Sequence, residues 1–378
     1  MNRTLRNGLA LVGTLTFLAL SGALWWAAIR LPRARVARVA DALSAARLDG
    51  SVRWRRPPLR PSRGLSQPAG LASEDVAAIR ALPSAPLRRL HEEVHAGRVG
   101  ERSSRWVRAH EPLVEALASR AHGPWSAPPA ELDGQTLSDA ALLLLGDAGT
   151  RAPGACLRRA AEAIRMGQDG AASPRWELRR IGVDVPHSAR PLVLRCAAAA
   201  SPEERREAAD QLARLAATPP PIAVAVRRQV AARGADLAEE AALELEHAVF
   251  GGFGEAYRYG LRGAVERLGA LDAPDAAPDP RRYPEGLRAA LPEARIVTQT
   301  DAAAQASLRA LAIAVAALAE GLPARPRALD DPRLADPFTG EPFEWTREES
   351  GGRLRSPGPS GLGVLDGPIE LRVSPGEG

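Results

Sequence analysis

The sequence predicts a mainly α-helical protein with an N-terminal transmembrane helix, a multi-helix body rich in Ala and Leu, and a small C-terminal antiparallel β module. Three observations support this fold class. Residues 8–29 carry no charge, apolar residues recur at helical spacing along most of the chain, and only 4% of the 378 residues are aromatic although 45% are hydrophobic. An Ala-rich core with few rings suits closely packed helices, because sheets favour aromatic and β-branched residues.

The uncharged run at residues 8–29 is long enough to span a bilayer. As a helix, its 22 residues would extend over about 33 Å. Trp25 and Trp26 lie at its end, where indole rings prefer the membrane interface. Because the run is too long for a typical cleaved signal and no convincing cleavage site follows it, we predict a retained anchor at residues 1–30 of a single-pass protein of the inner (cytoplasmic) membrane.

The arginines that flank the anchor give opposing signals for its orientation. Arg3 and Arg6 favour a cytoplasmic N-terminus, whereas ten arginines in residues 30–63 favour the opposite orientation by the positive-inside rule. We expect a periplasmic body, because large domains translocate largely regardless of charge and because the cysteines described below are placed to pair.

The net charge of +5 is unevenly distributed along the chain. Residues 1–29 carry +2 and residues 30–63 carry +8, so the remaining residues must carry −5. The basic segment is expected to bind anionic membrane lipid, at about 1 kcal/mol per arginine near the surface. The acidic body is not expected to bind nucleic acid. All 50 basic residues are arginine, which excludes a P-loop and a PLP site, and we predict no cofactor.

Beyond the anchor we expect a juxtamembrane helix and a Pro/Arg-rich linker at residues 31–71, an α-helical body at 72–322, and a Pro/Gly-rich β module with a disordered tail at 323–378. Ser73 is a candidate N-cap for the first body helix. Ser201 is another, because proline and two glutamates follow it. Further helices are predicted at residues 102–121, 137–146, 154–166, 188–200, 222–250, 257–271 and 301–321.

The two cysteines, Cys156 and Cys196, fit either of two states. Cys156 begins one predicted helix and Cys196 lies near the end of the next well-defined long one, so antiparallel packing would bring them together. A disulfide would close a loop of about 40 residues and stabilise the fold by roughly 4 kcal/mol through chain entropy. It would require an oxidising compartment. The alternative is a pair of buried thiols that pack as small hydrophobic side chains.

The composition changes after residue 322, where proline, glycine and aspartate cluster. Segments 342–346 and 353–356 are expected to form a hairpin, and residues 368–373 alternate as a third strand should. The segment DPFTGEPFEW, residues 336–345, is followed by SPGP at residues 356–359.

This pattern, over residues 336–373, resembles the C-terminal region of type II secretion major pseudopilins. The resemblance implies a similar local fold and a role in a secretion apparatus. It also implies a loop calcium site, although the loops after Trp345 keep only Asp366 and glutamates. Unlike a prepilin, the sequence after Gly8 has neither the first phenylalanine nor the fifth glutamate of the mature helix. The chain as a whole resembles uncharacterised membrane-anchored helical proteins of GC-rich Gram-negative bacteria.

One motif in the body has metal-ligand spacing. His91-Glu92-Glu93-Val94-His95 is H-E-x-x-H, in which two histidines share a helix face and can bind zinc, with Glu92 as general base. Zinc hydrolases have an apolar residue after the first glutamate, because the helix is buried beneath the site, and here it is Glu93. The competing interpretation is a solvated, charged turn of an amphipathic helix.

Three functional hypotheses follow from these features. The first is a membrane-anchored, non-catalytic interaction or scaffold protein of the cell envelope with an unknown protein partner. The second is an anchored zinc metallopeptidase that uses His91, Glu92 and His95. The third is a pseudopilin-like component of a secretion apparatus.

Overall fold

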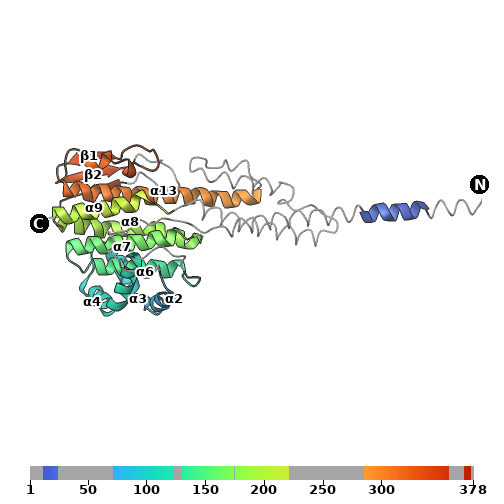
Figure 1. The fold of residues 1–378 in the computed structure, drawn as a ribbon, viewed down its shortest axis with the longest axis horizontal. Helices are drawn as coiled ribbons and strands as arrows, with labels where there is room; N and C mark the ends of the chain where they lie inside the picture. The colour runs from blue at the N-terminus through green and yellow to red at the C-terminus, as the bar shows by residue number, and fades with distance from the viewer. Residues whose placement is uncertain are drawn as a thin grey trace, which may run out of the picture. The chain divides into compact units, whose positions relative to one another are not determined.

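The computed structural model describes residues 12–23, 71–122, 129–173, 175–220, 285–356 and 370–375, without the side chains of Trp176 and residues 285–301 (Figure 1). The chain forms two compact units, Met1–Ser51 with Val226–Arg295, and Val52–Ala225 with Ile296–Gly378. The predicted juxtamembrane helix, the linker, the helices at 222–250 and 257–271, and the tail after residue 375 lie outside the described residues.

In the first unit, Val12–Ala23 is an apolar helix within the predicted anchor. Its large apolar side chains are all exposed. The hydroxyl of Thr16 donates to the carbonyl oxygen of Val12 at 2.8 Å, so this polar group has a partner inside the helix. Among the described residues, the helix that is long and apolar enough to cross a membrane is Ala302–Ala319, but 67% of it is buried inside the structure.

The core of the second unit is built around α6, Gly134–Ala148. This helix contacts α2 (Ser73–Arg80), α3 (Ser84–His95), α4 (Glu101–Ala109), α5 (Glu111–His122), α7 (Pro153–Ala171) and α8 (Trp176–Ala199). Most of its residues are buried, including a run of four leucines at 142–145. A helix that is apolar on all sides is stable in water only at the centre of a bundle, which explains this arrangement.

α7 and α8 pack extensively against each other and are joined by a disulfide. Cys156 near the start of α7 and Cys196 near the end of α8 are bonded, with Cα atoms 6.2 Å apart and a sequence separation of 40. Farther along, a Cβ added to Gly182 would lie 2.2 Å from the carbonyl oxygen of Gly167. The two glycines therefore let the helix backbones approach more closely than any larger side chain allows.

The start of the body differs from the sequence prediction in two places. Ser73 is the first helical residue rather than the cap, and the carboxylate of Asp75 accepts from the N–H of Ala72 at 2.8 Å. The single helix predicted at 102–121 was wrong, since α4 ends at Ala109 and α5 begins at Glu111. Pro112 explains the break, because proline lacks the N–H that would continue the helix.

At the other end of the body, α9 (Pro202–Ala217) begins as the sequence predicted. Ser201 accepts from the N–H of Glu204, whose carboxylate accepts in return from the N–H of Ser201. Arg205 then donates to the carbonyls of Ala197 and Leu318, at 2.6 and 2.9 Å. This guanidinium satisfies the carbonyl ends of α8 and of α13 (Glu285–Ala319), as basic side chains do at helix C-termini.

α13 spans Glu285–Ala319, and two 3-10 turns, η3 (Arg327–Asp330) and η4 (Pro332–Leu334), follow it. The C-terminal sheet consists of β1 (Glu344–Glu348), β2 (Gly351–Arg355) and β3 (Glu370–Val373), antiparallel in that order. Trp345 lies opposite Leu354, which lies opposite Leu371, and all three contribute to the hydrophobic core of the helices. Figure 1 shows the sheet beside α13, with α9, α8, α7 and α6 beyond it. The predicted helical body and small antiparallel sheet are both present.

Candidate functional site

The H-E-x-x-H motif lies in the last turns of α3. Leu87, Leu90 and Val94 are buried on one face of this helix, and α3 contacts α6 and α8. His91 and His95 lie on the exposed side, one turn apart. The helix ends immediately after the motif, where Gly97 adopts a left-handed conformation with φ of 70° that favours glycine.

The two histidine side chains contact each other. Their Nε2 atoms are 3.0 Å apart, and their ring centroids are 4.2 Å apart with the planes tilted by 59°. With both rings neutral, one Nε2–H donates to the other Nε2. The two imidazole rings therefore lie on one exposed face of α3, next to each other.

The glutamates of the motif have different environments. Glu92 is exposed, whereas general bases of zinc hydrolases are held beneath a bound substrate. Glu93 accepts from the N–H of Gly100 at 2.7 Å and so holds the start of α4. Glu93 therefore has a structural contact, which accounts for an acidic residue at a position where zinc hydrolases have an apolar one.

A third histidine, His187, acts electrostatically on His95. Partial burial lowers the pKa of His95, and the charges of His91 and His187 lower it further. Burial also lowers the pKa of His187, on α8, together with Arg190. Both shifts favour neutral imidazole, the form that binds metals. Within the described ranges, however, no three His, Cys, Asp or Glu side chains have the spacing of a metal site.

A network of charged side chains joins α5, α6 and α7, and sequence reasoning did not find it. Arg159 of α7 is nearly buried and pairs with Asp147 of α6 at 2.7 Å, Glu162 at 2.9 Å and Glu115 of α5 at 2.5 Å. His122 extends the network, with its Nε2 2.8 Å from Glu162. Arg158 and Arg159 look alike in sequence, so only the packing of three helices distinguishes the buried arginine.

The pseudopilin-like segment forms a tight turn held by a buried aspartate. Asp336 is fully buried, and its carboxylate accepts from the N–H of Phe338 at 3.2 Å and from the hydroxyls of Thr339 at 3.4 Å and Ser356 at 3.0 Å. Asp336 begins the DPFTGEPFEW segment and Ser356 begins the SPGP segment, so a direct hydrogen bond joins the first residues of the two segments. Because N–H and O–H donors occupy these carboxylate oxygens, the aspartate holds the turn rather than presenting ligands to calcium. Asp366 lies outside the described residues.

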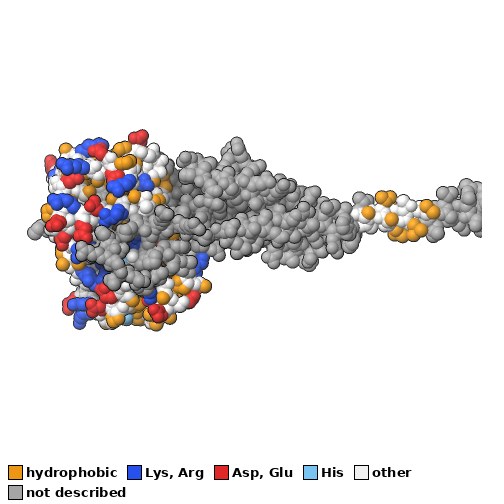
Figure 2. All heavy atoms as spheres, in the orientation of Figure 1, with side chains coloured by type: hydrophobic (Ala, Val, Ile, Leu, Met, Phe, Trp, Pro, Cys, Tyr) orange, Lys and Arg blue, Asp and Glu red, His pale blue; other side chains and the backbone are white. Residues whose placement is uncertain are grey.

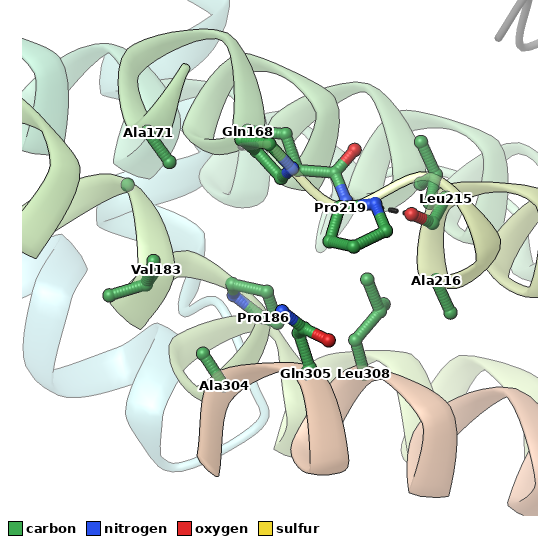
Figure 3. A pocket seen from close by; sticks show the side chains of 12 residues that line it. Gln168, Ala171, Val183, Pro186, Leu215, Ala216, Pro219, Ala304, Gln305 and Leu308 are labelled. Atoms are coloured by element: carbon green, nitrogen blue, oxygen red, sulfur yellow. Dashed lines mark hydrogen bonds between the residues drawn. The ribbon is translucent and has the colours of Figure 1, made fainter. Parts of the chain in front are cut away.

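A small apolar pocket lies between α7, α8, α9 and α13, with a volume of about 360 Å³ including its open mouth. Gln168 lies in its wall and donates to the carbonyl of Leu215 at 2.9 Å (Figure 3). The lining is mainly alanine, proline, valine and leucine, and Gln305 adds a second amide. It contains no charged side chain among its lining residues.

No protein-family model, curated protein or solved structure matches this chain. Only the geometry of the described residues therefore bears on function.

Proposed function

We propose that the protein is a membrane-anchored component of the cell envelope whose helical body serves as a non-catalytic interaction or scaffold module. One observation carries the proposal. Among the described residues, every large hydrophobic side chain that is exposed lies on the Val12–Ala23 helix, at 58–69% relative exposure. Figure 2 shows this helix without charged side chains, whereas arginine and acidic side chains are interspersed over the visible face of the body.

The energetics of the helix favour a lipid environment. Burying a side chain such as Leu15, Phe17 or Leu18 in an apolar medium is worth about 1.5–3 kcal/mol each. The exposed apolar side chains surround the helix instead of forming one stripe, because Leu15, Phe17, Leu18 and Leu20 point in different directions at 3.6 residues per turn. A bilayer covers all sides of such a helix at once, and a single protein groove does not.

The disulfide supports a position of the body outside the cytoplasm. Disulfides persist in oxidising compartments such as the bacterial periplasm and are rare in the cytosol. The Cys156–Cys196 bond joins helices that are close neighbours, and both cysteines are buried. Together with the N-terminal helix, this supports a single-pass protein of the inner membrane with a periplasmic body.

The outer face of the C-terminal sheet supports an interaction role. Arg355 and Glu344 are 3.6 Å apart across β1 and β2, and Arg353 lies 3.4 Å from Glu348 and 3.9 Å from Glu370 of β3. Exposed ion pairs of this kind contribute little to stability. They can exchange partners at low cost, as the rim of a protein–protein interface does.

Membrane fractionation with a topology assay tests the proposal. We expect the full-length protein to remain in the membrane after alkaline carbonate extraction, and its body to be digested by protease added to spheroplasts. Leu18→Arg costs about 2.5–3.5 kcal/mol of insertion at a helix centre and should shift protein into the soluble fraction, whereas Leu18→Ile should not. Soluble full-length protein with an intact N-terminus would refute the anchor.

The partner is tested by mild crosslinking in intact cells and purification of the full chain. Recovery of secretion machinery would favour the pseudopilin-like alternative over a general scaffold role. A Glu344→Arg variant reverses one charge on the sheet face without removing core packing. The interaction proposal predicts weaker recovery of the partner with this variant, and unchanged recovery would exclude the sheet face.

A further inference from the structure

We propose that His91 and His95 form a two-ligand site on the exposed face of α3 for a divalent transition-metal ion that prefers imidazole in tetragonal geometry, Cu²⁺ before Ni²⁺. This inference goes beyond the proposed scaffold role and does not depend on it. It also differs from a zinc peptidase, which needs three protein ligands and a water activated for hydrolysis.

The distance between the two nitrogens is the main support. Metal–imidazole bonds of about 2.0–2.1 Å place two ligand nitrogens about 2.9 Å apart at a right angle and about 3.3–3.4 Å apart at a tetrahedral angle. The Nε2 atoms of His91 and His95 are 3.0 Å apart. The spacing already matches adjacent corners of a square, the geometry that Cu²⁺ and Ni²⁺ favour with nitrogen ligands.

The backbone beneath the pair is already fixed. Leu90 and Val94 precede the two histidines by one residue each and are fully buried in the core. The i and i+4 positions of the ligands therefore do not change on binding, and only the imidazole rings need to rotate. The ion replaces one histidine–histidine hydrogen bond with two coordinate bonds.

The site leaves the other coordination positions open. Both ligand side chains are exposed, and the described residues supply no third ligand with suitable spacing. Water or a small anion would complete the coordination shell, so we expect one exchangeable ion for each chain.

Calorimetric titration of the full-length protein in detergent, purified on a histidine-free tag, tests the proposal with CuCl₂ and NiCl₂. We expect one site for each chain, with Cu²⁺ bound more tightly than Ni²⁺. His91→Ala and His95→Ala should each weaken binding by about tenfold or more, since even outer-shell changes cost about 10–100-fold in metal affinity. Each of these side chains is exposed, and circular dichroism in EDTA should show that both variants stay folded.

His110→Ala is the matched control, because His110 lies on the turn between α4 and α5, with its Nδ1 2.9 Å from the carbonyl of Trp106. It should bind Cu²⁺ as the wild type does. Unchanged binding in His95→Ala, or the absence of a stoichiometric site, would overturn the proposal. A loss of similar size in His187→Ala would replace the two-ligand site with a three-ligand one. Zinc-dependent proteolysis that Glu92→Gln abolishes would restore the peptidase interpretation.

Discussion

Removing the Cys156–Cys196 disulfide should destabilise the body by about 4 kcal/mol. The bond closes a loop with a sequence separation of 40, and the chain-entropy relation gives roughly 13 cal/mol/K for a loop of that length, or about 4 kcal/mol at 25 °C. A Cys156→Ala, Cys196→Ala double variant leaves most of the local packing in place, because a buried thiol packs as a small hydrophobic side chain.

The measurement is urea unfolding followed by circular dichroism, on the full chain in detergent. With a slope of about 2 kcal/mol/M, the midpoint should fall by about 2 M. Wild type in reducing agent serves as the control, since it lacks the bond but keeps both sulfur atoms, and it should unfold close to the double variant. If reduced and oxidised wild type unfold at the same urea concentration, the loop-closure reasoning is wrong. Free thiols at these positions in intact cells would contradict the periplasmic body.

Three other substitutions, with Arg105→Ala as a control, test the remaining structural claims by thermal or urea unfolding. Arg159→Ala should cost about 1.5–3 kcal/mol, because it takes a charged hydrogen-bond partner from Asp147 and Glu162, which keep Arg151 and His122 as partners. Arg105→Ala breaks an exposed pair at 3.8 Å and should change stability by at most about 1 kcal/mol. Asp133→Ala should cost about 1 kcal/mol at pH 7 by removing the N-cap of α6. The pKa of Asp133 is lowered below its ordinary 3.8, mainly by the hydrogen bond from the backbone N–H of Thr136. The stability that Asp133 contributes is therefore complete above pH 3.8 and is lost as pH falls through the lower pKa of the folded state. Wild type and variant should converge in stability at that lower pH. Gly182→Ala should destabilise by about 1–3 kcal/mol, because the added Cβ would lie 2.2 Å from a backbone oxygen of α7; equal stability would show that the helices separate without cost.

Local signals in the sequence predicted most helix starts and the order of the strands. Ser201 with Glu204 forms the expected reciprocal cap, because such a cap depends only on residues within one turn. The strands were each placed within about two residues, at Glu344–Glu348, Gly351–Arg355 and Glu370–Val373, since alternation and turn residues are also local.

Tertiary packing overrode local signals in α8. The sequence predicted a helix at residues 188–200 only, although prolines at 186 and 191 disfavour a helix interior. The observed helix begins at Trp176 and continues through both prolines. Its contact with α7 is the most extensive in the body, and this packing outweighs the loss of two backbone hydrogen bonds.

The candidate site shows the same limit. The one-turn spacing of His91 and His95 follows from helix geometry, so the sequence predicted that they share a helix face. The influence of His187 depends on how α3 meets α8, since 92 residues separate it from His95 in the numbering. Such contacts between distant helices are set by the whole bundle and leave no local pattern in the sequence.

Helix α7 carries several of the contacts that hold the body together. α7 contacts α5, α6, α8 and α9. It carries Cys156, Arg159 and Gly167, which take part in the disulfide, the ionic network and a close backbone approach to α8. α6 is held against α7 by Asp147, and α3 packs in turn on α6. The exposed histidine pair therefore rests on helices that are fixed by covalent, ionic and steric contacts. If that rigidity sets the 3.0 Å spacing, the Cys156→Ala, Cys196→Ala double variant should bind Cu²⁺ at His91 and His95 more weakly than wild type only at urea concentrations that begin to unfold the body.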